Sequence, residues 1–533
     1  MNSLIVILAS LVFLGAGYFF YARIIERFFE VNPKNVMPAH EYFDGVDYVP
    51  ARNWLILFSH HFASIAGAGP IVGPIIGVAL WGWWPALLWI VFGTIFMGGV
   101  HDFATLIISV RHKGRSIADV AESVISKRAK LIFLGFVWLA LVLVIAVFAS
   151  ICAKTLTAEP KTVAPCFGLI GVALITGFML YRLRINIFFA TAIGLALLLA
   201  CIVLGDFFPL SLAAGPWIVI LLIYAFIASV APVHVLLQPR DYISSFLLYF
   251  GIGAGLVGIV ITHPTINTVA FGGWTSADSG WLWPMLFVTI ACGANSGFHA
   301  LVSSGTTSKQ LVNERFAKRI GYGGMALEAV LAIIALLAVS AGLGAGKLSI
   351  MLSKGGPGPI GAFGQGYGAL TAPLLFGRGN LVAVMILNAF ILTTLDTATR
   401  ICRYLSEELF KIKNRFFSTF VVIFTSGLLA LSGKWGKIWP VFGASNQLVA
   451  ALSFVVISSW LLCRGKSLKF TFLPAVFMLL TSIGALLYQT VHFIKDKEFL
   501  LAGVSIALIA MTGAMIFDVF TVVKKRRVTC STA

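Results

Sequence analysis

Uncharged apolar stretches dominate this chain, and their length decides its fold class. About 20 apolar residues in a helix cross the roughly 30 Å hydrocarbon core of a bilayer. We mark about fifteen segments long enough to do so, at residues 3–23, 55–80, 83–110, 130–154, 165–181, 186–205, 215–236, 243–263, 283–303, 322–346, 380–401, 415–432, 438–463, 470–491 and 498–523. We therefore predict an all-α integral membrane protein.

The composition agrees with this fold class, because 59% of the residues are hydrophobic and only 11% are charged. Soluble globular proteins carry about 25% charged residues. No polar stretch is long enough to fold separately, so we predict one polytopic membrane domain over 1–533. Its expected parts are an N-terminal span and cytoplasmic linker at 1–53, a first repeat at 54–205, a second repeat at 206–402, and C-terminal accessory helices at 403–533.

The net charge of +18 is unevenly distributed. About three quarters of the Lys and Arg residues fall in alternate connections, which the positive-inside rule places in the cytoplasm. The N-terminus is then outside and the C-terminus inside. We expect the basic face to meet anionic lipids of the bilayer rather than nucleic acid. The first span lacks a basic leader and a clear cleavage site, so we interpret it as a retained anchor.

Glycine and proline interrupt the second predicted span at Ala66, Gly67, Gly69 and Pro70. Unpaired backbone groups at membrane depth are tolerated only inside protein or along a cavity. Because proline has no N–H, the carbonyl of Ala66 loses its usual helical partner. Such a carbonyl can bind a cation or a substrate ammonium group. The alternative is a packing kink with close helix contact.

A second interruption is expected at Ser229 and Pro232, in a span of opposite orientation. Two broken helices at corresponding positions of oppositely oriented halves are typical of inverted-repeat transporters with a site at the midplane. Spans 2–6 and 7–11 would form the two repeats of a five-plus-five, LeuT-like core.

The ninth span carries a third irregular patch, which includes Asn295, Ser296 and His299. Its small hydroxyl-bearing side chains would suit ion coordination, and they would equally suit a close helix seam. Both interpretations stay open.

Ionisable side chains inside spans are costly and indicate function. His60, His61, Asp102, His299 and Glu328 all fall roughly 10–15 Å in from the basic face, at 1.5 Å per helical residue. Such a layer resembles a proton relay, and the alternative is a structural hydrogen-bond network. Asp396 is a further relay candidate, although it stands four residues before Arg400 and can simply pair with it.

The sequence contains no motif for metal binding, phosphate binding or nucleophilic catalysis. No His-x-x-x-His pair lies on one helix face, so we expect no metal site. Phosphate-binding loops and nucleophile elbows are missing as well, so we expect neither a cofactor nor an enzyme. Whether Cys152 and Cys166, which flank one outer loop, form a disulfide stays open.

A family resemblance rests on motifs along nearly the whole chain. DGVDYVP at 44–50, HHFASIAGAGP at 60–70, LLQPRDY at 236–242, SGFHALVSSGTT at 296–307, GYGGM at 321–325, LTTLD at 392–396 and NQL at 446–448 resemble the carbon starvation protein CstA family. His101 and His234 stand where that family usually has Gln and Trp.

The resemblance implies a transporter of the bacterial inner membrane that imports peptides during carbon starvation, with relatives that are proton-coupled pyruvate symporters. It also implies kinship with the amino acid, polyamine and organocation transporters. We predict an ion-coupled importer of short peptides, with pyruvate or another small carboxylate as the alternative substrate. A passive channel and a nutrient sensor are the alternatives of another class. The coupling ion, H⁺ or Na⁺, and the oligomeric state stay open.

Overall fold

A computed structural model describes residues 1–232, 235–276, 279–344, 346–353 and 355–531 of the chain. His234 lies outside these residues. Helices make up nearly all of the regular structure in the described part. The exception is a hairpin of two short strands, β1 (Thr275–Ser276) and β2 (Gly280–Trp281), which pair antiparallel. The prediction of an all-helical membrane protein is confirmed.

Eleven helices are long and apolar enough to cross a membrane in the described part of the chain. They are Ser3–Phe28 (α1, η1, α2), Trp83–Arg111 (α6, η2, α7), Lys127–Ala158 (α9), Pro160–Arg182 (η3, α10, η4), Ile187–Phe207 (α11), Leu237–Thr262 (α13), Glu314–Gly342 (η6, η7, α17, η8), Gly379–Leu409 (α21), Trp435–Cys463 (α23), Phe472–Lys495 (α24) and Phe499–Val522, which is part of α25 (Phe499–Ser531).

A twelfth span is broken. The helices α4 (Trp54–Ile65) and α5 (Gly69–Trp81) pass the same test together but are bent by 42° at the break between them. Two further apolar helices, α12 (Ala214–Val230) and α22 (Arg415–Leu431), are shorter than a full span. The segment predicted as a span at 283–303 consists of three short helices, α14 (Leu282–Thr289), α15 (Ala291–Ala294) and α16 (Gly297–Gly305).

Small helices lie in the connections. They are α3 (Pro38–Glu41), α8 (Ile117–Val124), η5 (Thr307–Lys309), α18 (Lys347–Leu352), α19 (Gly358–Leu370) and α20 (Ala372–Leu375). The helix α8 begins at a serine cap, because Oγ of Ser116 accepts a hydrogen bond from the N–H of Asp119 at 3.2 Å. The helix α19 packs along α21 and η8 (Ala338–Gly342).

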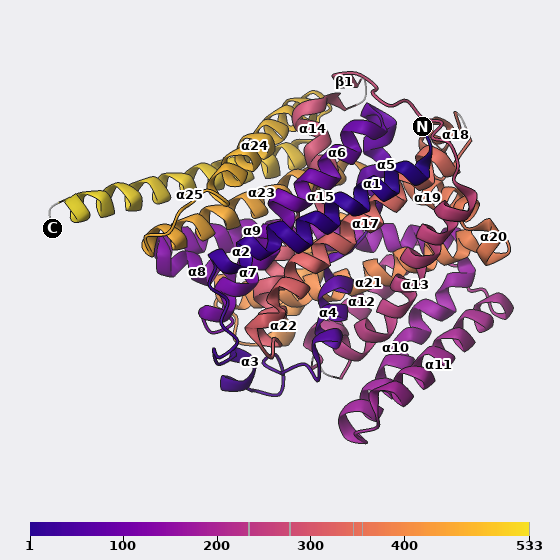
Figure 1. The fold of residues 1–533 in the computed structure, drawn as a ribbon, viewed down its shortest axis with the longest axis horizontal. Helices are drawn as coiled ribbons and strands as arrows, with labels where there is room; N and C mark the ends of the chain where they lie inside the picture. The colour runs from indigo at the N-terminus through magenta and orange to yellow at the C-terminus, as the bar shows by residue number, and fades with distance from the viewer. Residues whose placement is uncertain (233–234, 277–278, 345, 354, 532–533) are drawn as a thin grey trace.

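The centre of the bundle is formed by α9 and α21, which pack along one another. In the most apolar window of α21, 89% of the residues are buried, whereas only 17% are buried in that of α11. The helices α10 (Val163–Gly177) and α11 therefore lie at the periphery, where they form an edge of the molecule (Figure 1). The last turns of α25 project from the opposite edge (Figure 1).

Connections rich in Lys and Arg meet at one end of the bundle, which we call the basic face. Oη of Tyr48 donates to the carbonyl of Lys113 at 3.0 Å, and Nζ of Lys466 lies 2.8 Å from Glu30. The N–H of Ala51 donates to the carbonyl of Gln310 at 3.1 Å. Segments that the charge pattern assigns to one side of the membrane are therefore in contact.

Cys152 and Cys166 are both free thiols in the structure. The structure joins them by no disulfide, and packing and hydrogen bonds hold the end of α9 near Cys152. Oγ1 of Thr155 donates to the side-chain oxygen of Asn388 in α21, and this bond joins the two central helices.

Candidate functional site

The break in the second span lies where the glycine and proline pattern predicts it. The helix α4 begins with Asn53, whose Oδ1 accepts from the N–H of Ile56 at 2.9 Å. It ends at Ala66, which leaves helical geometry with φ −77° and ψ 73°. Pro70 occupies the first turn of α5, where its missing N–H costs no helical bond. Within the described part of the chain, the carbonyl of Ala66 accepts no hydrogen bond.

The glycines of the break allow close contact with three other helices. A Cβ built on Gly67 would lie 2.6 Å from the ring of Phe148 in α9 and 3.0 Å from Oγ1 of Thr394 in α21. A Cβ on Gly69 would lie 2.3 Å from Cβ of Cys292 in α15. No side chain fits at either position without movement of its neighbours. The packing interpretation of these glycines is therefore supported, and it is compatible with a buried, unpaired carbonyl at Ala66.

The segment opposite this break is itself interrupted. Asn295 and Ser296 have extended backbones between α15 and α16. Asn446 of α23 supplies the missing cap, since its Oδ1 accepts from the N–H of Phe298 at 2.8 Å and its Nδ2 donates to Oγ of Ser296 at 3.0 Å. Nδ2 of Asn295 points to Sδ of Met478 at 2.9 Å, and its Oδ1 has no hydrogen-bond partner among the described residues.

A buried row of imidazoles and carboxylates joins α7 (Gly99–Arg111), α16 and α17 (Gly323–Leu337). Nδ1 of His101 lies 2.9 Å from Oδ1 of Asp102, and Nδ1 of His299 lies 2.8 Å from Oδ2 of the same carboxylate. On its other side, Nε2 of His299 lies 3.1 Å from Oε2 of Glu328, at ion-pair distance but without hydrogen-bond alignment. All four side chains are fully buried. The structure thus brings together Asp102, His299 and Glu328, and it adds His101.

The two adjacent histidines of α4 point to different partners. Nδ1 of His60 lies 2.6 Å from Oδ2 of Asp241 in α13. Nδ1 of His61 lies 2.9 Å from Oγ1 of Thr307, and its ring packs beside Gly324 of α17. Successive residues of a helix point about 100° apart, which accounts for this divergence. The Nε2 atoms of both rings have no hydrogen-bond partner among the described residues.

A second buried cluster surrounds Arg240. Its Nη2 lies 2.6 Å from Oδ1 of Asp241, and its Nη1 contacts Oδ2 of Asp396 and the hydroxyl of Tyr224. The same hydroxyl donates to Asp396 at 2.7 Å. With His60 bound to Asp241, the cluster extends from α4 through α13 to α21 and α12. Hydrogen bonds to both carboxylates offset part of the cost of burying these charges.

The predicted pair of Asp396 and Arg400 is wrong. Asp396 binds Arg240, whereas Nη1 of Arg400 lies 3.3 Å from Oδ1 of Asp47 in the linker before α4. Arg400 also donates to the carbonyl of Ala228 at 2.8 Å. Spacing along one helix identifies residues that can meet, but a partner on a neighbouring helix competes with it. The charged partner from α13 prevails here.

Ser229 and Pro232 lie at a helix end rather than at a break within a span. The helix α12 stops at Val230, and α13 begins at Leu237. The carbonyls of Ala228 and Ala231 both accept hydrogen bonds from Arg400, so an arginine occupies the acceptors that a substrate or cation would use. Ser229 is buried without a side-chain partner among the described residues. The interruption that faces residues 66–69 is the one at 290–296.

Sequence reasoning missed the Arg240 cluster and the cap from Asn446. Arg240 and Asp241 fall just before the span predicted at 243–263, so they are assigned to a connection. The helix α13 begins earlier and carries both of them into the buried region. A signal exists in the adjacent Arg-Asp pair directly after a proline. Asn446 stands at no break of its own helix, and nothing in its local sequence marks the helix that it caps.

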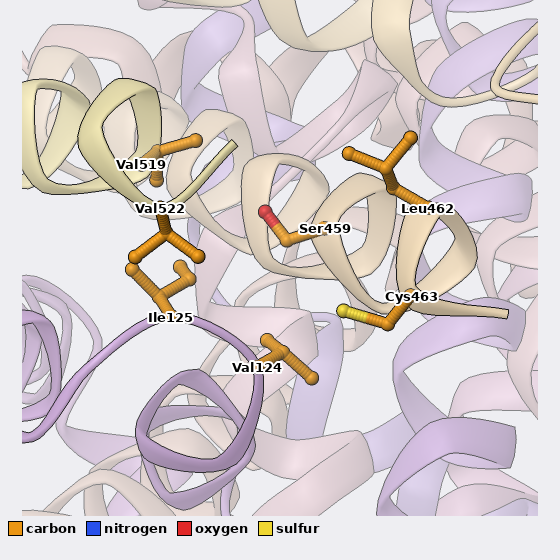
Figure 2. A pocket seen from close by; sticks show the side chains of 7 residues that line it. All are labelled: Val124, Ile125, Ser459, Leu462, Cys463, Val519 and Val522. Carbon is orange, nitrogen blue, oxygen red and sulfur yellow. The ribbon is translucent and has the colours of Figure 1, made fainter. Parts of the chain in front are cut away.

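Some hollows in the described part of the chain lack such chemistry. One lies where the end of α23 meets α25 and the turn after α8, and Figure 2 shows its side chains, which are mostly aliphatic. Ser459 is its single hydroxyl and Cys463 its single thiol. The candidate site is therefore the region between the two interrupted segments, together with the two buried clusters beside it.

Known proteins resemble this chain over most of its length. The model of the family "Carbon starvation protein CstA" matches residues 2–354 and 345–485. "Peptide transporter CstA" of Campylobacter jejuni is 30% identical over 97% of this chain and 84% of its own length. The same-named protein of Bacillus subtilis is 32% identical over 86% of this chain and 85% of its own length. "Pyruvate/proton symporter BtsT" of Escherichia coli is 30% identical over 91% of this chain and 81% of its own length.

Solved structures show a similar fold in more distant proteins. A crystal structure of the Eremococcus coleocola manganese transporter matches with a TM-score of 0.54 and 13% identity, over 90% of this chain and 99% of that one. This likeness concerns the fold alone. The extensive matches to curated relatives carry more weight: the chain belongs to the carbon starvation protein CstA family, a family of multi-pass bacterial membrane transporters.

Proposed function

We propose that this protein is a proton-coupled secondary transporter that imports short peptides across the bacterial inner membrane. The observation that carries the proposal is the buried row His101, Asp102, His299 and Glu328, which adjoins an interrupted helix. Two carboxylates that share one imidazole form a coupled site whose proton count can change as a unit. A change in its charge alters the attraction between α7, α16 and α17.

The substrate would bind between the two interrupted segments. Backbone acceptors beside Ala66 and the free Oδ1 of Asn295 could receive the ammonium group of a peptide. At the start of α16, Asn446 already binds the N–H of Phe298, and the other backbone N–H groups of this first turn favour a carboxylate. Discontinuous helices serve this purpose in other transporters because their ends expose groups that continuous helices conceal.

A five-plus-five core is supported by the way in which the helices pack, with repeat boundaries that differ from those expected at 54–205 and 206–402. In the first repeat we place α4 to α7, α9, α12 and α13, with α10 and α11 as an inserted hairpin. In the second we place α14 to α17, α21, α22 and α23. The contacts then correspond in pairs. The last helix of each repeat packs on the first, as α13 does on α4 and α23 does on α16.

Further equivalent contacts agree with these boundaries. The helix α12 packs on α9, and α22 packs on α21. The third helices of the two repeats, α9 and α21, pack on each other along the presumed symmetry axis. Counted with the broken and short segments, the chain would cross the membrane about fifteen times. The basic face would then be cytoplasmic, next to anionic lipids, with the N-terminus outside.

Proton coupling is favoured over sodium coupling by the partners of the hydroxyl groups near the break. Oγ of Ser64 lies 3.2 Å from Oγ1 of Thr397, and Oγ1 of Thr394 donates to the carbonyl of Ser64 at 3.1 Å. These groups satisfy one another, so a sodium ion would have to displace existing hydrogen bonds. In the imidazole and carboxylate row, Nε2 of His299 and both oxygens of Glu328 have no hydrogen-bond partner among the described residues, so a proton can bind there without displacing one.

Pyruvate is the second candidate substrate, because the Escherichia coli relative whose name specifies pyruvate and protons matches 91% of this chain. An uptake panel separates the candidates. Proteoliposomes would receive labelled dipeptides, tripeptides or pyruvate at two pH values, with and without sodium. The proposal predicts peptide uptake that increases with an inward proton gradient and does not change with sodium. Uptake of pyruvate alone would show that pyruvate, not a peptide, is the substrate. Uptake that depends on sodium would show that Na⁺, not H⁺, is the coupling ion.

A further inference from the structure

A cavity of about 300 Å³ opens at the basic face, away from the interrupted segments. Its wall is made by the linker before α4, the turn into α8, the segment at η5 and the basic-face end of α21. We call it the basic-face cavity. Seven charged side chains line it, so the pairing of these charges decides what the cavity can hold.

Every carboxylate in its wall has a cationic partner. Asp47 binds Arg400 at 3.3 Å, and Asp119 binds Lys130 at 2.7 Å. The two glutamates are satisfied likewise: Glu407 lies 3.1 Å from Arg403, and Glu408 contacts Lys130. The acidic groups therefore offer little attraction to a further cation.

Two cations in the wall lack such partners. No carboxylate of the described residues lies within ion-pair distance of Nζ of Lys309. The guanidinium group of Arg115 makes no ion pair or hydrogen bond with the described part of the chain. Both side chains line the cavity, and their charges remain available to an anion.

The ammonium group of Lys309 is held in place by its surroundings. It lies over the rings of Tyr48 and Tyr404, at 5.2 and 4.7 Å from their centres. Both rings are fixed, since Tyr48 donates to the carbonyl of Lys113 and Tyr404 donates to Asp47. A Cβ on Gly114 would lie 3.4 Å from Cγ of Lys309, so the aliphatic part of the side chain is packed too.

Burial lowers the pKa of Lys309 below its ordinary value, although Asp47 and Asp44 act to raise it. A neutralising anion beside the ammonium group would oppose that effect. The site is therefore preorganised for an anion that it does not supply itself. Arg115, on the facing turn, can contribute a second and more flexible contact.

We propose that the basic-face cavity binds the carboxylate group of the transported molecule, with Lys309 as its principal contact. The inference rests on the proposed function, since both substrate candidates carry a carboxylate. The cavity would be the place where substrate pauses between the membrane-embedded site and the cytoplasm. The basic-face end of α16 also lines it, through Leu301, Ser304 and Gly305, but neither interrupted segment does. Removal of the charge of Lys309 need not affect the inner clusters.

Protection of Lys309 from acylation tests the proposal directly. Purified wild-type protein would react with limiting acetic anhydride, and peptide mass spectrometry would give the rate at Lys309. Lys469 is an internal control, because its ammonium group also lies over an aromatic ring, at 4.7 Å from the centre of Phe470, but outside the cavity. The added probes would be trialanine, trialanine amide, pyruvate, inorganic phosphate and chloride.

We expect saturating trialanine or pyruvate to slow labelling of Lys309 at least fivefold and to leave Lys469 unchanged. Trialanine amide, which lacks the carboxylate, should give no protection. Separate measurements with trialanine and with pyruvate show which of the two substrate candidates binds in the cavity. Equal protection by the amide, by phosphate or by chloride would overturn the assignment, and so would the lack of any protection.

Substitutions give a second measurement. Lys309→Met should weaken binding from the basic face roughly tenfold, the factor that corresponds to about 1.4 kcal/mol. Lys309→Arg should retain most of the affinity, and Lys469→Met should behave as wild type. Unchanged affinity in Lys309→Met would contradict the proposal. The labelling experiment does not require transport. If the protein transports substrate but Lys309 is not protected, only the cavity proposal is refuted. If Lys309 is protected but no transport occurs, only the proposed function is refuted.

Discussion

Nδ1 of His299 lies 2.8 Å from Oδ2 of Asp102, and this contact joins α16 to α7 in a fully buried region. The helix α16 begins directly after the interruption that borders the candidate site. A change in the protonation of either residue therefore acts on the position of a helix end. This coupling between charge and helix position is the basis of the transport mechanism proposed above.

Replacement of the central carboxylate should abolish coupled uptake. Asp102→Asn keeps the shape of the side chain but removes the charge that His101 and His299 share. We expect at least a hundredfold loss of proton-driven uptake, with normal amounts of protein in the membrane. Uptake by proteoliposomes and quantitative immunoblots of membranes measure the two quantities. Full uptake by this variant would exclude Asp102 from the mechanism.

A substitution of Glu328 should separate substrate exchange from proton-coupled accumulation. Glu328→Gln removes the carboxylate at the far side of His299 and leaves the contact between His299 and Asp102. We expect substrate exchange across the membrane to persist while accumulation against a gradient is lost. Counterflow and gradient-driven uptake in the same proteoliposomes measure both. Loss of both activities in a folded variant would indicate a role in binding instead.

The Arg240 cluster should contribute strongly to stability. Arg240→Met leaves Asp241 and Asp396 buried without their shared cation, and loss of one partner of a buried ion pair costs about 3–5 kcal/mol. Thermal unfolding in detergent should therefore begin at a distinctly lower temperature.

A second substitution controls for local damage in this cluster. The double variant Arg240→Met with Asp396→Asn should recover part of the lost stability, because one uncompensated charge is removed. Unchanged unfolding temperatures in the single variant would show that the cluster is not a stabilising ion pair. A double variant less stable than the single one would contradict the electrostatic explanation.

The sequence predicts the depth of charged residues better than their partners. Helical rise alone predicts Asp102, His299 and Glu328 in one layer, and the structure places His299 against both carboxylates. The partner of Asp396 could not be predicted in this way, because Arg240 lies on another helix and just outside the predicted span. Spacing along a helix reports which residues share a face, whereas pairing between helices depends on how the bundle packs.

The helix breaks, too, could be predicted only in part from the sequence. Residues 66–70 combine two glycines with a proline, so the interruption follows from backbone chemistry. At 229–232 the same kind of signal marks the end of α12, since a proline ends a helix as readily as it breaks one. The segment that faces the first break was identified in sequence only as a polar patch around Asn295. Its extended backbone depends on the cap from Asn446, which is distant in sequence.

Gly297 tests the importance of close packing at the second interruption. A Cβ there would lie 2.2 Å from the carbonyl oxygen of Asn446 and 2.4 Å from Cβ of Val449, so α23 would have to move. We expect Gly297→Ala to lower both the unfolding temperature and the uptake rate. Gly253→Ala in α13 is the matched control, because nothing lies within 4 Å of its added methyl group.

The control variant Gly253→Ala should not lower the stability of the protein. Alanine in a helix interior is more favourable than glycine by roughly 0.5–1 kcal/mol, so Gly253→Ala should be neutral or slightly stabilising. If Gly297→Ala behaves like Gly253→Ala, the contact between α16 and α23 has room to adjust, and the cap from Asn446 does not fix the interruption.

The central claim is that the protein couples substrate movement to a proton gradient, and accumulation in proteoliposomes tests it most directly. With an imposed inward proton gradient, the account predicts that labelled substrate rises inside well above the external concentration and returns to it when a protonophore is added. Substrate that only equilibrates, with or without the gradient, would contradict the account and indicate a passive pathway.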